Sequence, residues 1–136
     1  MKTKSLLLVS LLIMSGASFA VERLVPTDAF GNQKLNDTHY RVEGKKSVPI
    51  DAFGNQKMDQ THYRIEGNKT IPTDAFGNPK LDKTYYKTEG NRIIPTDAFG
   101  IQQWHQTHYL IKENKIIPTD ASGNQKWKST QYQIKK

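Results

Sequence analysis

The sequence predicts an all-β protein made of five β-hairpin repeats, and three observations carry that prediction. Proline recurs at positions 26, 49, 72, 95 and 118, a spacing of 23 residues, and each proline heads a near-copy of V/I-P-T-D-A-F-G-N-Q-K. Every copy contains two turn signals, and the segment between them alternates polar and apolar residues. A unit of 23 residues cannot enclose its own core, so neighbouring copies must bury surface against one another.

Residues 1–20 have the features of a secretory signal peptide. Lys2 and Lys4 precede an apolar run from Leu6 to Met14, and Ser18-Phe19-Ala20 supplies small residues for cleavage after Ala20. The apolar run is shorter than the roughly 20 residues that a membrane-spanning helix needs. We therefore expect a periplasmic or secreted protein with no stable membrane insertion after cleavage.

The rest of the chain, residues 21–136, forms one predicted repeat domain without cysteine, so its stability must come from sheet pairing or association. The formal net charge of +7 falls to +5 when Lys2 and Lys4 leave with the signal. A moderately basic surface favours anionic partners such as acidic polysaccharides. Copies one to five span residues 25–47, 48–70, 71–93, 94–116 and 117–136.

The first turn signal is T-D-A-F-G-N. Its aspartate can accept hydrogen bonds from the backbone of its own turn, and its glycine can take a positive φ. These residues are therefore predicted to be structural turn-formers and not calcium ligands. They are Asp28, Gly31, Asp51, Gly54, Asp74, Gly77, Asp97, Gly100, Asp120 and Gly123.

The second turn signal is E-G-N-K, in which Gly67-Asn68 lies between two extended runs as a two-residue hairpin loop requires. Copy four replaces the glycine with Glu113. Asn114 tolerates left-handed geometry, so we expect this turn to persist at slightly lower stability.

Between the turns, T-H-Y-R-I at residues 61–65 reads as a strand with Tyr63 and Ile65 on one face and His62 and Arg64 on the other. The return segment K-T-I-P-T is rich in β-branched residues, but its proline cannot donate a ladder hydrogen bond. Each proline is therefore expected at a strand end, a bulge or an unpaired edge.

We expect the hairpins to form an elongated, twisted antiparallel meander, with a β-solenoid as the alternative. A solenoid would stack the five turn aspartates as a column of like charges, which favours the meander. Ser122, Gln131 and Lys135-Lys136 give the last copy a polar character suited to a terminal edge. Residues 21–24 are interpreted as a short lead-in.

Aromatic residues recur at regular pitch and are the candidate binding residues. The tyrosine of each strand alternates as a buried sheet residue does, whereas the turn phenylalanines either cover the sheet as lids or project as binding knobs. Neighbouring lysines can hold anionic groups. The candidate binding set is Phe30, Phe53, Phe76, Phe99, Trp104, Trp127, Lys34, Lys57 and Lys80.

His39, His62 and His108 share one column of the repeat and are interpreted as a solvated strand face. Tyr85 and Gln131 interrupt the column, so we expect no metal and no cofactor. The sequence contains no recurring nucleophile motif and no pair of unlike carboxylates, so we expect no catalytic residues and no enzyme activity.

These features predict an exported, non-enzymatic bacterial β-repeat protein that acts as a binding or structural module at the cell envelope. Its expected partners are glycans or other repetitive anionic polymers, because identical weak contacts add up along such a partner. One alternative is a self-assembling extracellular fibre or matrix component. A second alternative is a metal-responsive or pH-responsive protein that uses the histidine column.

Overall fold

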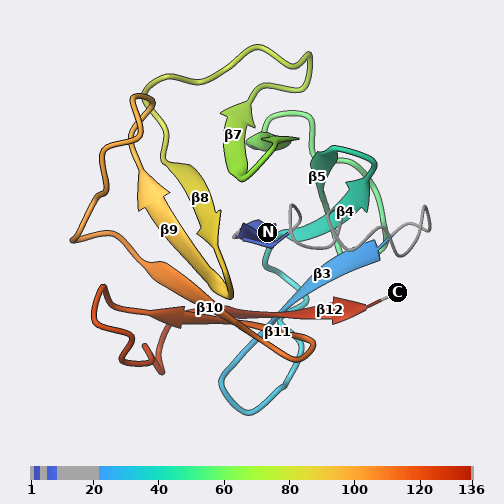
Figure 1. Ribbon diagram of the computed structural model, residues 1–136. Coiled ribbons are helices and arrows are strands. Elements are labelled where there is room, and N and C mark those ends of the chain that lie inside the picture. Colours follow the sequence, from blue (N-terminus) through green and yellow to red (C-terminus); the bar gives the residue numbers. More distant parts are fainter. Residues whose placement is uncertain (1, 4–5, 9–21, 136) are drawn as a thin grey trace.

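The structure is a computed structural model that describes residues 2–3, 6–8 and 22–135. Within these residues, ten antiparallel strands close into a barrel, and no helix occurs (Figure 1). Two further short strands, β1 (Lys2–Thr3) and β2 (Leu6–Leu8), pair with each other. The predicted cleavage site after Ala20 and most of the predicted apolar run lie outside the described residues.

The barrel consists of two-stranded hairpins that share one register. In the first hairpin His39 pairs with Ile50, Tyr40 with Pro49 and Glu43 with Lys46, and the later hairpins repeat these pairs column by column. The strands are β3 (Glu22–Thr27), β4 (His39–Glu43), β5 (Lys46–Ile50), β6 (His62–Glu66), β7 (Lys69–Thr73), β8 (Tyr85–Glu89), β9 (Arg92–Thr96), β10 (His108–Lys112), β11 (Lys115–Thr119) and β12 (Gln131–Lys135).

Two-residue turns join the strands of each hairpin, as the sequence predicted. Gly44, Gly67 and Gly90 take φ values of 58° to 61°, a region that L-residues with a Cβ rarely occupy. In copy four Glu113 occupies the same position with φ 57°. The turn therefore persists without glycine, and Glu113 takes the left-handed conformation that the prediction had assigned to Asn114.

Neighbouring hairpins are paired over much shorter ladders than the strands within a hairpin. Between β5 and β6 the paired residues are Lys46 with Arg64 and Ser47 with Tyr63, and the ladder ends before Pro49. Beyond this point the chain folds back, and Lys57 N donates to the Pro49 carbonyl at 2.9 Å. The proline therefore lies beyond the end of the ladder with the next hairpin, where it offers an acceptor but no donor, while it stays paired with Tyr40 inside its own hairpin.

The expected antiparallel meander is confirmed, but the expectation that it is elongated is wrong, because the two ends of the chain pair with each other. In β12 and β3, Tyr132 pairs with Pro26 and Ile134 with Leu24, in the register of an ordinary hairpin. Residues 22–24 are thus part of a barrel strand and not a lead-in, and copy five does not cap an open edge. The antiparallel order also excludes the β-solenoid alternative.

The interior of the barrel holds the main hydrophobic core. Leu24, Ile93 and Ile116 are fully buried there, and Val42, Ile65, Ile111 and Ile134 pack with them. Burial of these branched aliphatic side chains is the principal favourable contribution to the free energy of folding. Ser47 and Thr70 occupy the same inward column as Leu24, so part of the interior is polar.

The tyrosine column forms an aromatic series around the inside of the barrel. Tyr132, Tyr40, Tyr63, Tyr86 and Tyr109 follow one another, with ring centroids 6.1 to 6.4 Å apart. Some ring surface stays accessible, yet enclosure by the barrel wall raises the pKa of Tyr40 to about 12. The tyrosines are therefore core residues, as their alternation predicted.

Candidate functional site

All five long loops leave the barrel at the same end. Each hairpin has its short turn at one end and its long connection at the other, so all five loops start at the same end, and they surround the barrel (Figure 1). The loops are residues 28–38, 51–61, 74–84, 97–107 and 120–130.

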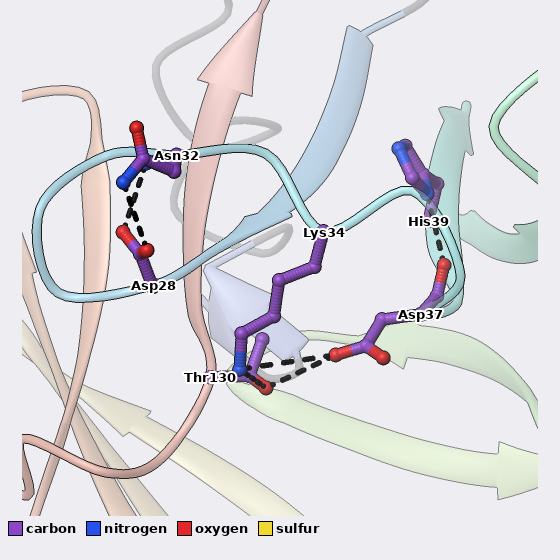
Figure 2. A network of polar contacts seen from close by, with 6 residues as sticks. All are labelled: Asp28, Asn32, Lys34, Asp37, His39 and Thr130. Carbon is purple, nitrogen blue, oxygen red and sulfur yellow. Dashed lines mark hydrogen bonds and ion pairs between the residues drawn. The ribbon is translucent and has the colours of Figure 1, made fainter.

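The first turn of every loop is organised by its aspartate. Asp28 Oδ1 accepts hydrogen bonds from Phe30 N and Asn32 N at 2.9 Å. Asn32 Nδ2 also donates to Asp28 Oδ2 at 3.0 Å (Figure 2). The glycine of the turn takes a φ of 89° at Gly31. The same bonds surround Asp51, Asp74 and Asp120, and these amide contacts lower the pKa of their carboxyls.

The phenylalanine of this turn projects into solvent. Phe30, Phe53, Phe76 and Phe99 are 85 to 90% exposed, which decides between the two roles considered for them. They are knobs and not lids over the sheet. Copy five carries Ser122 at this place, so the ring of knobs has one gap.

The second turn of every loop exposes another large apolar side chain. Trp104 and Trp127, which the sequence analysis names as candidate binding residues, are 63% and 65% exposed. The corresponding residues of the other copies were not recognised as site residues. The sequence signal that could have identified them is a large apolar residue at this position in every copy. These residues are Leu35, Met58, Leu81, Trp104 and Trp127.

We call the exposed phenylalanines and this second column the apolar tips. Exposed apolar side chains are normal when scattered, but a set that recurs regularly around a molecule marks an interaction surface. The first turns of the loops reach back along the outer wall: Arg92 Nη2 donates to the Ala121 carbonyl at 3.1 Å, although Arg92 directly follows the short turn of its hairpin. The apolar tips therefore surround the barrel wall.

Each candidate lysine donates a hydrogen bond to a threonine of a neighbouring loop. Lys57 Nζ donates to Thr38 Oγ1 at 3.3 Å, and Lys80 Nζ donates to Thr61 Oγ1 at 3.2 Å. Lys34 Nζ makes the same bond to Thr130 Oγ1 at 3.0 Å (Figure 2). Each of these lysines links its loop to the preceding loop, so they space the tips around the ring.

The expectation of a solvated histidine face is wrong. His39 and His108 are 1% exposed and His62 is 7% exposed, because the long loops fold over the outer wall of the barrel. Gln33 Nε2 lies 3.1 Å from His39 Nε2, and His39 Nδ1 lies 3.1 Å from the Asp37 carbonyl. A neutral ring that donates from Nδ1 and accepts at Nε2 satisfies both contacts.

Burial lowers the pKa of His39 and His108, which favours this neutral form. Among the described residues, no group of three or more His, Cys, Asp or Glu side chains could hold a metal ion. The histidines therefore act as buried links between loop and strand.

Comparison of the chain with protein-family models, with curated proteins and with solved structures gave no match. In the part of the chain that the structure describes, no helix is long and apolar enough to cross a membrane.

Proposed function

We propose that the protein is a non-enzymatic binding module of the bacterial cell envelope that attaches to a repetitive partner through the apolar tips of its loops. The observation that carries this proposal is the repeated exposure of Phe30, Phe53, Phe76 and Phe99 on the loops that surround a closed barrel. Exposed apolar side chains add no stability to a soluble domain. Their repeated exposure to water is best explained by a partner that covers them.

A glycan chain is the partner class that this arrangement favours. Aromatic rings stack on the apolar faces of sugar rings, and their two side-chain torsions make this contact cheap in conformational entropy. Loops that repeat at a constant angle around a ring can engage several units of one polymer, or several chains of a wall. Weak contacts then combine into a strong attachment without any new contact.

The two alternatives have less support. Assembly into a fibre by strand addition needs an open sheet edge, and every strand of the described barrel pairs with a neighbour on both sides. A metal or pH response through the histidine column needs accessible imidazoles, whereas His39, His62 and His108 are covered by the loops.

Graded removal of the tips tests the proposal. Purified protein would be applied to glycan arrays, cell-wall polysaccharides and whole cells, with Phe30→Ala, Phe53→Ala, Phe76→Ala and Phe99→Ala combined in steps. We expect the apparent affinity for the bound polymer to fall with each substitution and to be at least tenfold weaker in the quadruple variant.

Copy five provides a matched gain-of-function control. Ser122→Phe adds the missing knob at an exposed position, so we expect tighter polymer binding with an unchanged urea midpoint. The proposal is contradicted if the unmodified protein binds no polymer, or if the quadruple variant binds as tightly as the unmodified protein.

A further inference from the structure

The third hairpin carries a cavity that the repeat pattern alone does not predict. It has a volume of about 190 Å³ and lies on the outer wall between strands β7 and β8 and the turn at residues 96–100. Pockets for drug-sized ligands begin at about 300 Å³, so this one suits a single small ring.

An arginine that lies against the following loop in copies one and two is absent from this cavity. In copy two, Arg64 Nη1 donates to the Gly77 carbonyl at 2.9 Å and fills the space between strand and turn. Arg41 makes the equivalent contact with Gly54 O at 3.5 Å. In copy three the residue is Lys87, whose Nζ pairs with Glu89 at 2.8 Å and which lines the cavity together with Gly100.

A second substitution shapes the floor of the cavity. Tyr85 replaces the histidine of the column and is only 9% exposed, so its ring lies in the wall. Copy three also has Pro79 in place of the glutamine that bonds the histidine in copies one, two and four. The glutamine and the histidine have thus changed together, and an aromatic ring lines the space.

The remaining lining mixes donors with acceptors. Lys69 offers an ammonium group, Glu66 a carboxylate, and Ile71 an apolar contact. The Asp97 carboxylate is already engaged by Phe99 N and Ile101 N at 2.9 Å. A tyrosine ring, a donor and an acceptor around one small space match the apolar face and the adjacent hydroxyl groups of a hexose.

We propose that this cavity is a hexose-binding subsite that holds one sugar unit of the polymer engaged by the apolar tips. The inference rests on the proposed function and names the monomer class that the third hairpin recognises. The cavity would select for a particular sugar, whereas the apolar tips only stack on sugar rings.

The test is a titration of isotopically labelled protein with D-galactose and D-galacturonate, monitored by amide chemical shifts. We expect saturable shifts at residues 96–100 with at least one of the two sugars. Comparison of the two sugars distinguishes a neutral ring from an acidic one. No saturable shift at residues 96–100 with either sugar overturns the inference.

Matched arginine and lysine variants identify the cavity as the site. Lys87→Arg restores the residue of copy two and fills the space, so we expect at least tenfold weaker hexose binding. Arg64→Lys makes the same exchange in copy two, where His62 and Gln56 stand in place of Tyr85 and Pro79, so we expect no hexose shifts near Gly77. Hexose binding that Lys87→Arg leaves unchanged counts against the cavity.

Failure of this inference is distinguishable from failure of the proposed function. The tips are tested with polymer and phenylalanine variants, whereas the cavity is tested with monosaccharides and the Lys87→Arg variant. Loss of polymer binding in the quadruple phenylalanine variant, with no monosaccharide shifts, overturns the subsite and leaves the tips supported.

Discussion

Lys34 Nζ donates a hydrogen bond to Thr130 Oγ1 at 3.0 Å, although 96 positions separate the two residues in the chain. The same bond joins Lys57 to Thr38 within consecutive copies at 3.3 Å. Thr130 Oγ1 in turn donates to Asp37 Oδ2 at 3.3 Å. The first and last copies are therefore linked in the same way as neighbours in sequence, which is what a closed ring requires.

Closure predicts that β3 is essential for stability although it lies at the edge of the repeat pattern. Leu24 is 0% exposed in the barrel interior, so we expect Leu24→Ala to lower the free energy of unfolding by about 2–5 kcal/mol. Leu35→Ala removes the same side chain from an exposed tip, and its effect should stay within about 0.5 kcal/mol. Urea denaturation measures both, and equal effects would contradict the place of β3 in the core.

The left-handed turn of copy four predicts a stabilising substitution. Glu113 has φ 57°, where a side chain costs roughly 1–2 kcal/mol, and part of the gain from glycine is offset by entropy in the unfolded chain. We expect Glu113→Gly to raise the free energy of unfolding by about 0.5–1 kcal/mol. Gly67→Glu is the reverse change at φ 61° and should be destabilising. A destabilised Glu113→Gly variant would show that the turn does not need glycine-like geometry.

The buried histidines predict a loss of stability in mild acid. Burial lowers the pKa of His39 and His108 from the ordinary 6.5, so the unfolded chain takes up protons first as the pH falls. Their contribution is complete above pH 6.5 and declines as the pH drops from 6.5 towards the lowered values. Asp51 opposes the lowering at His39, and Asp120 does so at His108.

Glutamine occupies the same column at Gln131, so His39→Gln with His108→Gln is a matched control. Urea midpoints of the double variant should change less between pH 7.5 and pH 5.5 than those of the unmodified protein. Identical pH profiles for the two proteins would contradict a buried neutral histidine.

The turn aspartates predict a second acid transition at lower pH. Backbone amides and Asn55 lower the pKa of Asp51, so its contribution is complete above the ordinary pKa of 3.8 and is lost as the pH falls through the lowered value. Asp51→Asn keeps an oxygen for the Phe53 and Asn55 amides, whereas Asp51→Ala removes it. We expect the alanine variant to melt at a lower temperature than the asparagine variant. The reverse order would contradict the turn role.

Local structure could be predicted from the sequence because it depends on neighbouring residues. The Asp28 turn, the Gly67 turn and the alternation of His62 and Tyr63 all follow from backbone geometry within a few positions. The position of Pro49 beyond the end of the ladder between β5 and β6 agrees with its missing N–H. These features agree with the structure.

Closure could not be predicted from the local pattern, because it depends on the angle between hairpins. That angle is set by the short ladder between β5 and β6 and by the loop that takes its place beside Pro49. One signal was present in the sequence. Residues 23–27 match the return strand at residues 69–73, so the first copy brings a return strand that precedes its own first loop and pairs with Gln131–Lys135.

Burial of the histidines could not be predicted from alternation, because it depends on a contact between a loop and a strand. Alternation assigns His39 to the outer face but gives no information on what covers that face. The glutamine six residues earlier, Gln33, is the partner that buries it. Copy three replaces both the glutamine and the histidine, with Pro79 and Tyr85, and this joint change was the sequence signal that the two positions are in contact.

An engineered disulfide across the two chain ends tests the closed ring most directly. Arg23 pairs with Lys135 across β3 and β12, and paired antiparallel residues have Cα atoms about 4.5–5.5 Å apart, within disulfide range. The protein contains no cysteine, so Arg23→Cys with Lys135→Cys introduces a single possible bond. Lys46→Cys with Lys135→Cys is the control, because Lys46 lies in the next hairpin along the ring.

After mild oxidation, intact mass and alkylation of the monomer report whether the bond has formed. The account predicts a complete intramolecular disulfide for the Arg23 and Lys135 pair and none for the control pair. A monomer that keeps both thiols free in the Arg23 and Lys135 variant would contradict the closed ring.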